Sequence, residues 1–380
     1  MFRTPNAEDY MDIEDCKLEL ADKQRRLQTL LAEQDLDAII ISRHENIAWA
    51  TAGLVDLRVG LLRESGVGSL LITKEGKSYC LTTDNEAVRL YEEEFSHLDY
   101  EPLVQPWYAH DMQASIRKIV GAGKVAGDMP LGTATGAISL QPMRLELTTS
   151  EVARYRRLGR FAADAASQVL HLLRPGMSEM TMQAMLAERL ISQGILPSVY
   201  LNAVDDRIRS YRHAVPRAGV LERFGMISFC ARRWGLTVSI TRFVHFGAMP
   251  AELEDKFAAV AHVNARLMEA TRMGASSDAL FTVAHEAYKS VGYAGEELRH
   301  HQGGPTGYVE REWVARPGGV ERIVAQQALA WNPNLQGAKV EDTVVLRDGV
   351  LERLTDTPHL PVVTTRLNGI EYRTAGVLAG

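Results

Sequence analysis

The sequence predicts a two-domain protein of the mixed α/β (α+β) class. Its 380 residues are enough to form two hydrophobic cores. The first 145 residues or so alternate helical and strand-like segments. The remainder has two helical segments followed by strands, and then the same order again, which is typical of an internal duplication. We therefore expect one domain over residues 1–147 and a second over residues 148–380.

The segments of the first domain follow from the spacing of apolar residues. Leucines recur on one side of a helix in residues 17–35, and Ile39-Ile40-Ile41 is the β-branched core of a buried strand. A Gly-containing turn around Gly76 separates two further strand-like runs and predicts a hairpin. The expected elements are a helix at 17–35, a strand at 37–41, hairpin strands at 69–73 and 78–82, a helix at 85–95 and a strand end at 125–128.

The second domain is expected to begin after a linker at 129–147, which is rich in Pro, Gly, Thr and Ala. Thr149 and Ser150 precede Glu151 as helix caps do, so a long helix should run from there to Leu172. The further expected elements are helices at 179–193, 251–272 and 277–291 and strand-rich stretches at 197–246 and 300–363.

Composition narrows the classes of partner. A formal net charge of −6 and an isoelectric point near 6.0 do not favour binding to nucleic acid or to an anionic membrane. No apolar run reaches the roughly 18 residues that a membrane span requires, and the N-terminus lacks the apolar stretch of a signal peptide. Cys16, Cys80 and Cys230 are odd in number and widely spaced, as reduced thiols are. We expect a cytoplasmic globular enzyme or binding protein.

Several short strings occur in a meaningful order. In the first half, Asn46-Ile-Ala-Trp-Ala-Thr-Ala-Gly53 is similar to the N-x-x-Y-x-T-G strand of the creatinase/prolidase/aminopeptidase P family. The second half resembles the same family in five blocks, which are 174–178, 211–216, 235–247, 300–304 and 340–343. The resemblance covers roughly residues 18–363. It implies a creatinase-type N-terminal domain, a pita-bread (M24-like) catalytic domain with an internal pseudo-twofold repeat, and a homodimer in which the N-terminal domain completes the partner's site.

The resemblance also locates the family's metal ligands, which are two aspartates, a histidine and two glutamates. Ser239 stands where the second aspartate precedes the "T-R" pair, and Ser228, eleven residues earlier, stands at the first. Asn332 replaces the first glutamate, while Glu341 and a histidine remain. Formal ligand charge falls from about −4 to −1, and neutral serine is a poor ligand for a divalent ion. We therefore expect neither a metal nor another cofactor.

Creatinase resembles these peptidases but cleaves a C–N bond without metal, and its motif offsets recur here. Counted from His300, Tyr308 and Arg311 take the places of its "Y-x-x-R-E" block, which implies that Arg311 grips a substrate carboxylate. His213 matches its proton shuttle, and Arg58 falls near the arginine that the partner subunit supplies.

The sequence departs from creatinase at two glutamate positions, and the histidine pair can be aligned in two registers. Creatinase keeps glutamates at the positions of Thr241 and Asn332. A second register puts His301, not His300, on the metal-type histidine, because Gly304 then fits the H-x-x-G spacing, and both registers are kept.

The predicted function is that of a metal-independent hydrolase of a C–N bond in a small carboxylate-bearing substrate, in which acid–base groups and fixed charges carry the chemistry. The residues expected to be catalytic are His213, His300, His301 and Glu341. Those expected to contact substrate are Arg311, Arg58, Tyr308, Ser228, Ser239 and Asn332. For Glu341 the alternative is an internal salt bridge with Arg242. The alternatives for the whole chain are a metal-dependent Xaa-Pro aminopeptidase or prolidase, a non-catalytic pita-bread binding module, and a lyase or isomerase.

Overall fold

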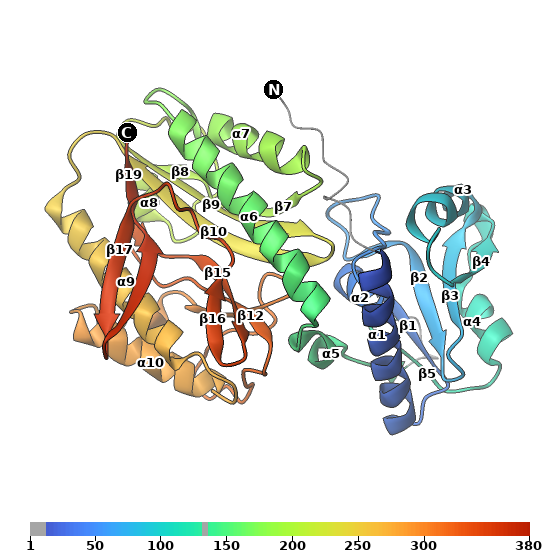
Figure 1. Ribbon diagram of the computed structural model, residues 1–380. Coiled ribbons are helices and arrows are strands. Elements are labelled where there is room, and N and C mark those ends of the chain that lie inside the picture. The colour runs from blue at the N-terminus through green and yellow to red at the C-terminus, as the bar shows by residue number, and fades with distance from the viewer. Residues whose placement is uncertain (1–12, 131–135) are drawn as a thin grey trace. The chain divides into compact units, whose positions relative to one another are not determined.

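The computed structural model describes residues 13–130 and 136–380, and Figure 1 shows it as a ribbon. The chain divides into two compact units between Arg144 and Leu145, three residues before the predicted boundary at 147. Within the described ranges, no helix combines the length and the apolar character needed to cross a lipid bilayer.

The first unit is a mixed α/β domain built on one sheet. Its strands lie in the order β4-β3-β2-β1-β5-β6, with β1 antiparallel to β2 and parallel to β5. The strands are β1 Ala38–Arg43, β2 Ser65–Thr73, β3 Ser78–Thr83, β4 Glu101–Gln105, β5 Val125–Gly127 and β6 Gly136–Ala137. The helical elements are α1 Ile13–Glu33, α2 His44–Ala50, α3 Asp84–Arg89, η2 Leu90–Glu94, η3 Trp107–Ala109, α4 Met112–Val120 and α5 Gln141–Leu145.

Most of the expected elements of this unit are confirmed. The isoleucines of β1 are completely buried, as the apolar run predicted. Strands β2 and β3 pair antiparallel around Gly76, whose φ of 87° is a conformation that glycine adopts without steric cost. The helix expected at 85–95 begins as α3 and continues as the π-helical turn η2.

Two expectations for the first unit were wrong. The segment Asn46–Gly53, expected as a strand, begins within α2, where Ile47 and Trp49 are buried and the Asn46 amide donates to the Asp128 carboxylate (2.8 Å). Short apolar segments do not distinguish helix from strand by pattern alone, and packing decided this one. The expected linker contains β6 and α5, and its residues 131–135 lie outside the described ranges.

The second unit repeats one order of elements, as predicted. Its first half contains α6 Thr149–Leu172, α7 Glu179–Ile191, β7 Leu196–Tyr200, β8 Ala203–Val204, α8 Asp206–Ser210, β9 Phe224–Arg233 and β10 Leu236–His245. The N-cap of helix α6 is Thr148, one residue before the predicted Thr149, because Thr148 and Glu151 form a reciprocal capping box. Figure 1 shows α6 lying across β9 and β10, against which it packs.

The second half contains α9 Ala251–Ala270, α10 Ser277–Ser290, η4 Glu296–Leu298, β11 Gly303–Thr306, β12 Gln327–Trp331, β13 Asn334–Leu335, β14 Ala338–Lys339, β15 Asp342–Arg347 and β16 Val350–Arg353. Strands β11, β12, β15 and β16 form an antiparallel sheet in that order. The chain ends in β17 Val362–Leu367, β18 Ile370–Ala375 and β19 Val377–Ala379. Strand β19 pairs parallel with β10, which joins the C-terminus to the first half of the repeat.

The β9–β10 hairpin fixes the register of the residues at the site. Its turn is made by Trp234 and Gly235, with φ values of 53° and 79°, a backbone that suits a two-residue hairpin loop. In this register Ser228 lies opposite Thr241, and Cys230 lies opposite Ser239. Side chains two residues apart on a strand share a face, so these four side chains lie together on one face of the hairpin.

Candidate functional site

One carboxylate faces this group of hydroxyl and thiol side chains. The backbone of Glu341 forms a bridge with Thr241, which places Glu341 beside the hydroxyl-bearing face of the hairpin. The Thr241 hydroxyl lies 2.6 Å from Glu341 Oε2 and 2.8 Å from Ser228 Oγ. Glu341 is 4% exposed, so its charge requires partners inside the protein.

Two cations supply those partners. Lys339 Nζ lies 2.7 Å from Glu341 Oε2, and Arg311 Nη2 lies 3.1 Å from Oε1. Arg311 also donates from Nη1 to Ser239 Oγ (2.9 Å), while Lys339 Nζ lies 3.3 Å from Ser228 Oγ. We call Glu341, Lys339 and Arg311, together with the three hydroxyls, the ionic cluster; its two cations and one anion leave a net charge of +1.

The charges set the protonation state of this carboxyl group. Burial raises the pKa of Glu341, but the attraction of Lys339 and Arg311 and the hydrogen bonds from Lys339 and Thr241 outweigh it and lower the pKa to about 2. Glu341 is therefore ionised at neutral pH. Burial raises the pKa of the neighbouring Cys230 thiol to about 12, so this cysteine stays protonated.

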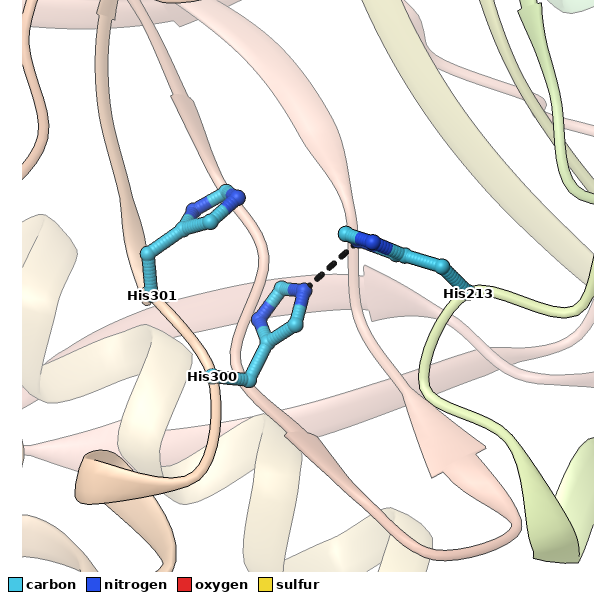
Figure 2. A group of neighbouring side chains, drawn as sticks. All are labelled: His213, His300 and His301. Atoms are coloured by element: carbon cyan, nitrogen blue, oxygen red, sulfur yellow. Dashed lines mark hydrogen bonds between the residues drawn. The ribbon is translucent and has the colours of Figure 1, made fainter.

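Three histidines form a second group, which we call the histidine cluster. His213 follows α8, and His300 and His301 lie between η4 and β11. The Nε2 atoms of His300 and His213 are 2.9 Å apart, and the rings of His300 and His301 stack with centroids 4.4 Å apart. Figure 2 shows His213 approaching from the opposite side to the other two rings. One nitrogen from each ring lies within 4.8 Å of the others.

The histidine rings are neutral at neutral pH. Burial, followed by the neighbouring His301 and Lys339, lowers the pKa of His300 to about 3. Burial and then Arg311 lower the pKa of His301 to about 4. Burial and Lys339 also lower the pKa of His213. The cations of the ionic cluster are thus close enough to disfavour protonation of the histidine cluster.

Some buried polar atoms around both clusters make no hydrogen bond within the described part of the chain. They are Arg311 Nε, His301 Nδ1 and Asn332 Oδ1. Buried polar groups in native proteins are satisfied by protein, water or ligand. A bound molecule with both donors and acceptors could satisfy these three atoms.

The residues of the ionic cluster do not fit a pair of divalent ions. Ser228 and Ser239 are neutral and already hydrogen-bonded within the ionic cluster, and Glu341 has both oxygens engaged by cations. A divalent ion there would lie beside Lys339 and Arg311. The three neutral imidazoles are a different donor set, of the kind that holds a single zinc ion.

The structure gathers most of the predicted site residues into two groups. His213, His300 and His301 form one cluster, so both registers of the histidine pair bring a ring to the site. Glu341, Arg311, Ser228 and Ser239 form the other cluster. Asn332 is joined to the histidine side, since its carbonyl accepts from the Asn334 amide at 3.2 Å.

Two predicted roles change. Tyr308 is completely buried and its hydroxyl donates to Glu151 in α6 (2.5 Å), so the expected substrate contact was wrong and the residue ties β11 to that helix. The alternative for Glu341 named the wrong partner. Arg242 pairs with the neighbouring Asp342 (2.6 Å), and the internal salt bridges of Glu341 are made with Lys339 and Arg311.

Arg58 lies in the first unit and donates from Nε to Asp56 (2.8 Å); its contact with a partner subunit stays a prediction. The glycines after the histidine pair serve strand packing. A Cβ at Gly303, where φ is 97°, would lie 2.1 Å from the carbonyl oxygen of Ala330 in β12. That approach demands glycine, so Gly303 is explained without a ligand.

Sequence reasoning missed several residues of the site. Lys339 stands two residues before Glu341, and residues two apart in an extended segment share a face, which was the available signal. Thr241 was noted only as a departure from creatinase. Asn334, which contacts His300, and Arg212, which contacts Asn334, were not singled out, because their meeting depends on the tertiary fold.

Comparisons with known proteins agree with this architecture. The family model for metallopeptidase family M24 matches residues 153–348, more than half of the 380-residue chain, and the creatinase/prolidase N-terminal domain model matches residues 23–141. An uncharacterized peptidase, YqhT, from Bacillus subtilis is 26% identical over 234 residues, a match that spans 58% of this chain and 65% of that relative's length.

Solved structures share the fold at lower identity. Dipeptidase PepE from Mycobacterium ulcerans superposes with a TM-score of 0.73 at 17% identity, covering 90% of this chain and 97% of the other. The Xaa-Pro dipeptidase from Bacillus anthracis superposes with a TM-score of 0.69 at 18% identity, covering 89% and 98%. The N-terminal and pita-bread domains expected from the sequence are thus confirmed. The chain belongs to metallopeptidase family M24, a family of hydrolases, and carries the creatinase/prolidase type of N-terminal domain.

Proposed function

We propose that this protein is a hydrolase that cleaves an amide-type C–N bond in a small carboxylate-bearing substrate without the family's pair of divalent ions. The observation that carries the proposal is the pairing of Glu341 with Lys339 and Arg311, among residues that the resemblance aligns with the family's metal ligands. Fixed cations at that place can stabilise developing negative charge, which is the electrostatic role that metal ions have in related enzymes.

Charge is the main argument against two divalent ions. Ser228 and Ser239 contribute no negative charge, and the single carboxylate is already neutralised. Unlike charges attract and like charges repel most strongly where water is excluded, so Lys339, with a side chain only 9% exposed, would oppose a nearby dication.

The same charges favour an anionic substrate group. Arg311 Nε–H has no hydrogen-bond partner among the residues that the structure describes, and the cluster's net positive charge attracts a carboxylate. Guanidinium groups bind carboxylates through charge-assisted hydrogen bonds that also orient them. In this proposal Arg58 of a partner subunit would provide a second contact, and the protein would act as a homodimer.

Acid–base chemistry falls to the histidine cluster. His213 is the most exposed of the three rings and is neutral at neutral pH, so it can accept a proton from water and return it to the leaving nitrogen. His300 and His301 would hold the reacting groups by hydrogen bonds. The ionised Glu341 would act through the cations that it positions.

A metal-dependent Xaa-Pro peptidase is the second candidate. The names of the similar proteins, which include a dipeptidase and an Xaa-Pro dipeptidase, favour it. Within this chain the specific observation is the three-histidine cluster, which could hold one ion in place of the family's two.

Turnover in the presence and absence of metal separates the candidates. The chain, stripped with dipicolinate, would be incubated with Xaa-Pro dipeptides, other dipeptides, and N-carbamoyl and N-amidino amino acids, and amine release measured with and without added Mn²⁺ or Zn²⁺. We expect the stripped protein to retain its full activity. Activity that disappears on stripping and returns with metal would establish the second candidate.

Arg311→Lys tests the anchor in the same assay. Losing hydrogen bonds to a charged group should lower kcat/KM roughly 10- to 100-fold. Arg316→Lys is the matched control, since Arg316 is half-exposed and pairs with Glu321 at the surface, and it should leave kcat/KM unchanged. Equal effects of the two variants would refute the anchoring role.

A further inference from the structure

We propose that Asn334 and Arg212 lock His300 as a neutral imidazole with its proton on Nε2, so that His300 serves the site as a hydrogen-bond donor rather than as a base or an Nε2 metal ligand. Asn334 and Arg212 are positioning residues in this scheme. The tautomer follows from hydrogen bonds alone, and its role in turnover rests on the proposed function.

The first step is the orientation of the Asn334 side-chain amide. Arg212 Nη1 contacts both the side-chain Oδ1 and the backbone carbonyl of Asn334, the latter at 3.1 Å. A guanidinium group has only donors, so the atom facing it must be the amide oxygen. The other amide atom lies 3.2 Å from the carbonyl oxygen of Asn332, which can only accept, so that atom must be Nδ2. Two independent partners therefore fix the same orientation.

The second step is the tautomer of His300. Asn334 Nδ2 lies 2.9 Å from His300 Nδ1. An amide nitrogen only donates, so Nδ1 of His300 must accept and carries no proton. A neutral imidazole without a proton on Nδ1 carries it on Nε2. His300 Nε2–H then donates to His213 Nε2 at 2.9 Å (Figure 2), which leaves His213 with its own proton on Nδ1.

The third step is the rigidity of the lock. Arg212 forms an ion pair with Glu296, which holds its guanidinium against Asn334. The backbone N–H of Asn334 donates to the Tyr288 hydroxyl (2.8 Å), and that hydroxyl donates to Gln302 (2.8 Å). Asn334 is 5% exposed, so water does not compete freely for its amide. The whole arrangement can rotate only by breaking several bonds together.

The lock has a chemical consequence. Histidines that bind metal through one nitrogen usually donate the other N–H to a carboxylate or carbonyl, which fixes the metal-binding tautomer. At His300 the second partner is a donor, which selects the opposite tautomer. His300 can therefore donate Nε2–H to a substrate oxygen when His213 moves to take a proton, as a neutral imidazole acts as an electrophile in other enzymes.

Histidine nitrogens can be observed directly in ¹⁵N-histidine-labelled protein without substrate or metal. Long-range ¹H–¹⁵N spectra distinguish a protonated ring nitrogen from an unprotonated one, and His300→Gln and His213→Gln assign the signals. We expect His300 to show Nε2–H and His213 to show Nδ1–H. A His300 signal with the proton on Nδ1 overturns the proposal, whatever the activity assays show.

Asn334→Asp replaces the donor with an acceptor of the same size, and Arg212 still has a partner in the new carboxylate. We expect the His300 proton to move to Nδ1 in this variant. Arg212→Lys is the matched control, because lysine is also only a donor and should leave the Nε2–H tautomer in place. An unchanged tautomer in Asn334→Asp overturns the proposal; if that variant does not fold, the wild-type spectrum decides alone.

The part of the proposal that concerns turnover has its own readout. In Asn334→Asp we expect kcat to fall by at least about tenfold with little change in KM, because the donor acts on the reacting group and not on the anchor. A variant with the shifted tautomer and an unchanged kcat would remove His300 from the reaction. A wild-type protein that shows the predicted tautomer but cleaves none of the test substrates would leave the lock intact and defeat only the proposed hydrolase function.

Discussion

The ionic cluster and the histidine cluster both belong to the second unit, but ion pairs hold the first together and contacts between neutral rings hold the second. In the ionic cluster, Lys339 from β14 and Arg311 from the loop after β11 each place a cation at one oxygen of Glu341, and the carboxylate stays ionised. In the histidine cluster, loops bring three neutral rings together, and His301 Nδ1 has no partner within the described residues. Charges that contact an opposite charge and several hydrogen-bond partners resist rearrangement, whereas neutral rings with unused atoms can respond to a ligand.

Removing the anion should break the ionic cluster most severely. Glu341→Gln leaves Lys339 and Arg311 as buried cations without a counter-charge, which should lower the free energy of unfolding by about 3–5 kcal/mol at pH 7. Chemical denaturation measures this loss. The double variant Glu341→Gln/Lys339→Met should recover part of it, and a double variant no more stable than the single one would contradict the pairing.

The histidine cluster should respond in activity rather than stability. His213→Ala should lower kcat by about 10²- to 10⁴-fold, the usual contribution of a general acid or base. The free energy of unfolding should change little, because His213 is the most exposed residue of the cluster. His262→Ala is a suitable control, since that half-buried histidine lies in α9 outside both clusters. Equal losses of kcat in both variants would argue against a role for His213.

The pH dependence of stability should distinguish the two clusters. His300 and His301 have folded-state pKa values of about 3 and about 4, below the ordinary 6.5. Between each of these values and pH 6.5, the unfolded chain therefore binds more protons than the folded protein. Stability should therefore fall as the pH drops below 6.5, by up to about 1.4 kcal/mol per pH unit for each group. His300→Gln/His301→Gln should flatten this slope; an unchanged slope would show that the rings protonate freely.

Glu341 should affect the free energy of unfolding at a lower pH than the histidines do. The pKa of Glu341 is lowered from 4.5 to about 2, so its contribution is fully present above pH 4.5 and is lost as the pH falls towards 2. The free energies of unfolding of wild type and Glu341→Gln, measured by chemical denaturation, should therefore differ by a constant amount between pH 5 and pH 7. The two values should converge as the pH falls towards 2. Free energies of unfolding that converge near pH 6 would show that a group other than the Glu341 carboxyl causes the pH dependence.

The smallest effect should come from a single hydroxyl. Ser228→Ala removes one acceptor from Lys339 and Thr241, but both keep Glu341 as a partner. The expected loss of unfolding free energy is about 0.5–1.5 kcal/mol, the range of one ordinary hydrogen bond. A loss as large as that of Glu341→Gln would mean that the serine, not the anion, holds the ionic cluster together.

Much of the fold could be predicted because local patterns and tertiary structure agree. The apolar run of β1, the Gly76 turn and the repeated order of helices and strands required no knowledge of distant residues. The segment at Asn46 failed because its apolar pattern suits either a helix or a strand, and contacts such as that between Asn46 and Asp128 come from far along the chain.

The site was predictable in part for the same reason. Motif order located His213, the His300–His301 pair, Arg311 and Glu341, because these residues stand at fixed offsets within short strings. Tyr308 was assigned to substrate by its offset alone, but its hydroxyl meets Glu151, which is distant in sequence. Lys339 was overlooked although its spacing from Glu341 places both on one face of an extended segment.

By itself the sequence determined the two domains, the duplicated order of elements and the neutral side chains at 228, 239 and 332, since these depend on residue type and short-range spacing. Only the tertiary structure decided which charges neutralise Glu341 and which atom of His300 carries the proton. The contacts of Arg311 with Glu341 and of Asn334 with His300 join residues about 30 or more positions apart, and such directional contacts leave no periodic trace along the chain.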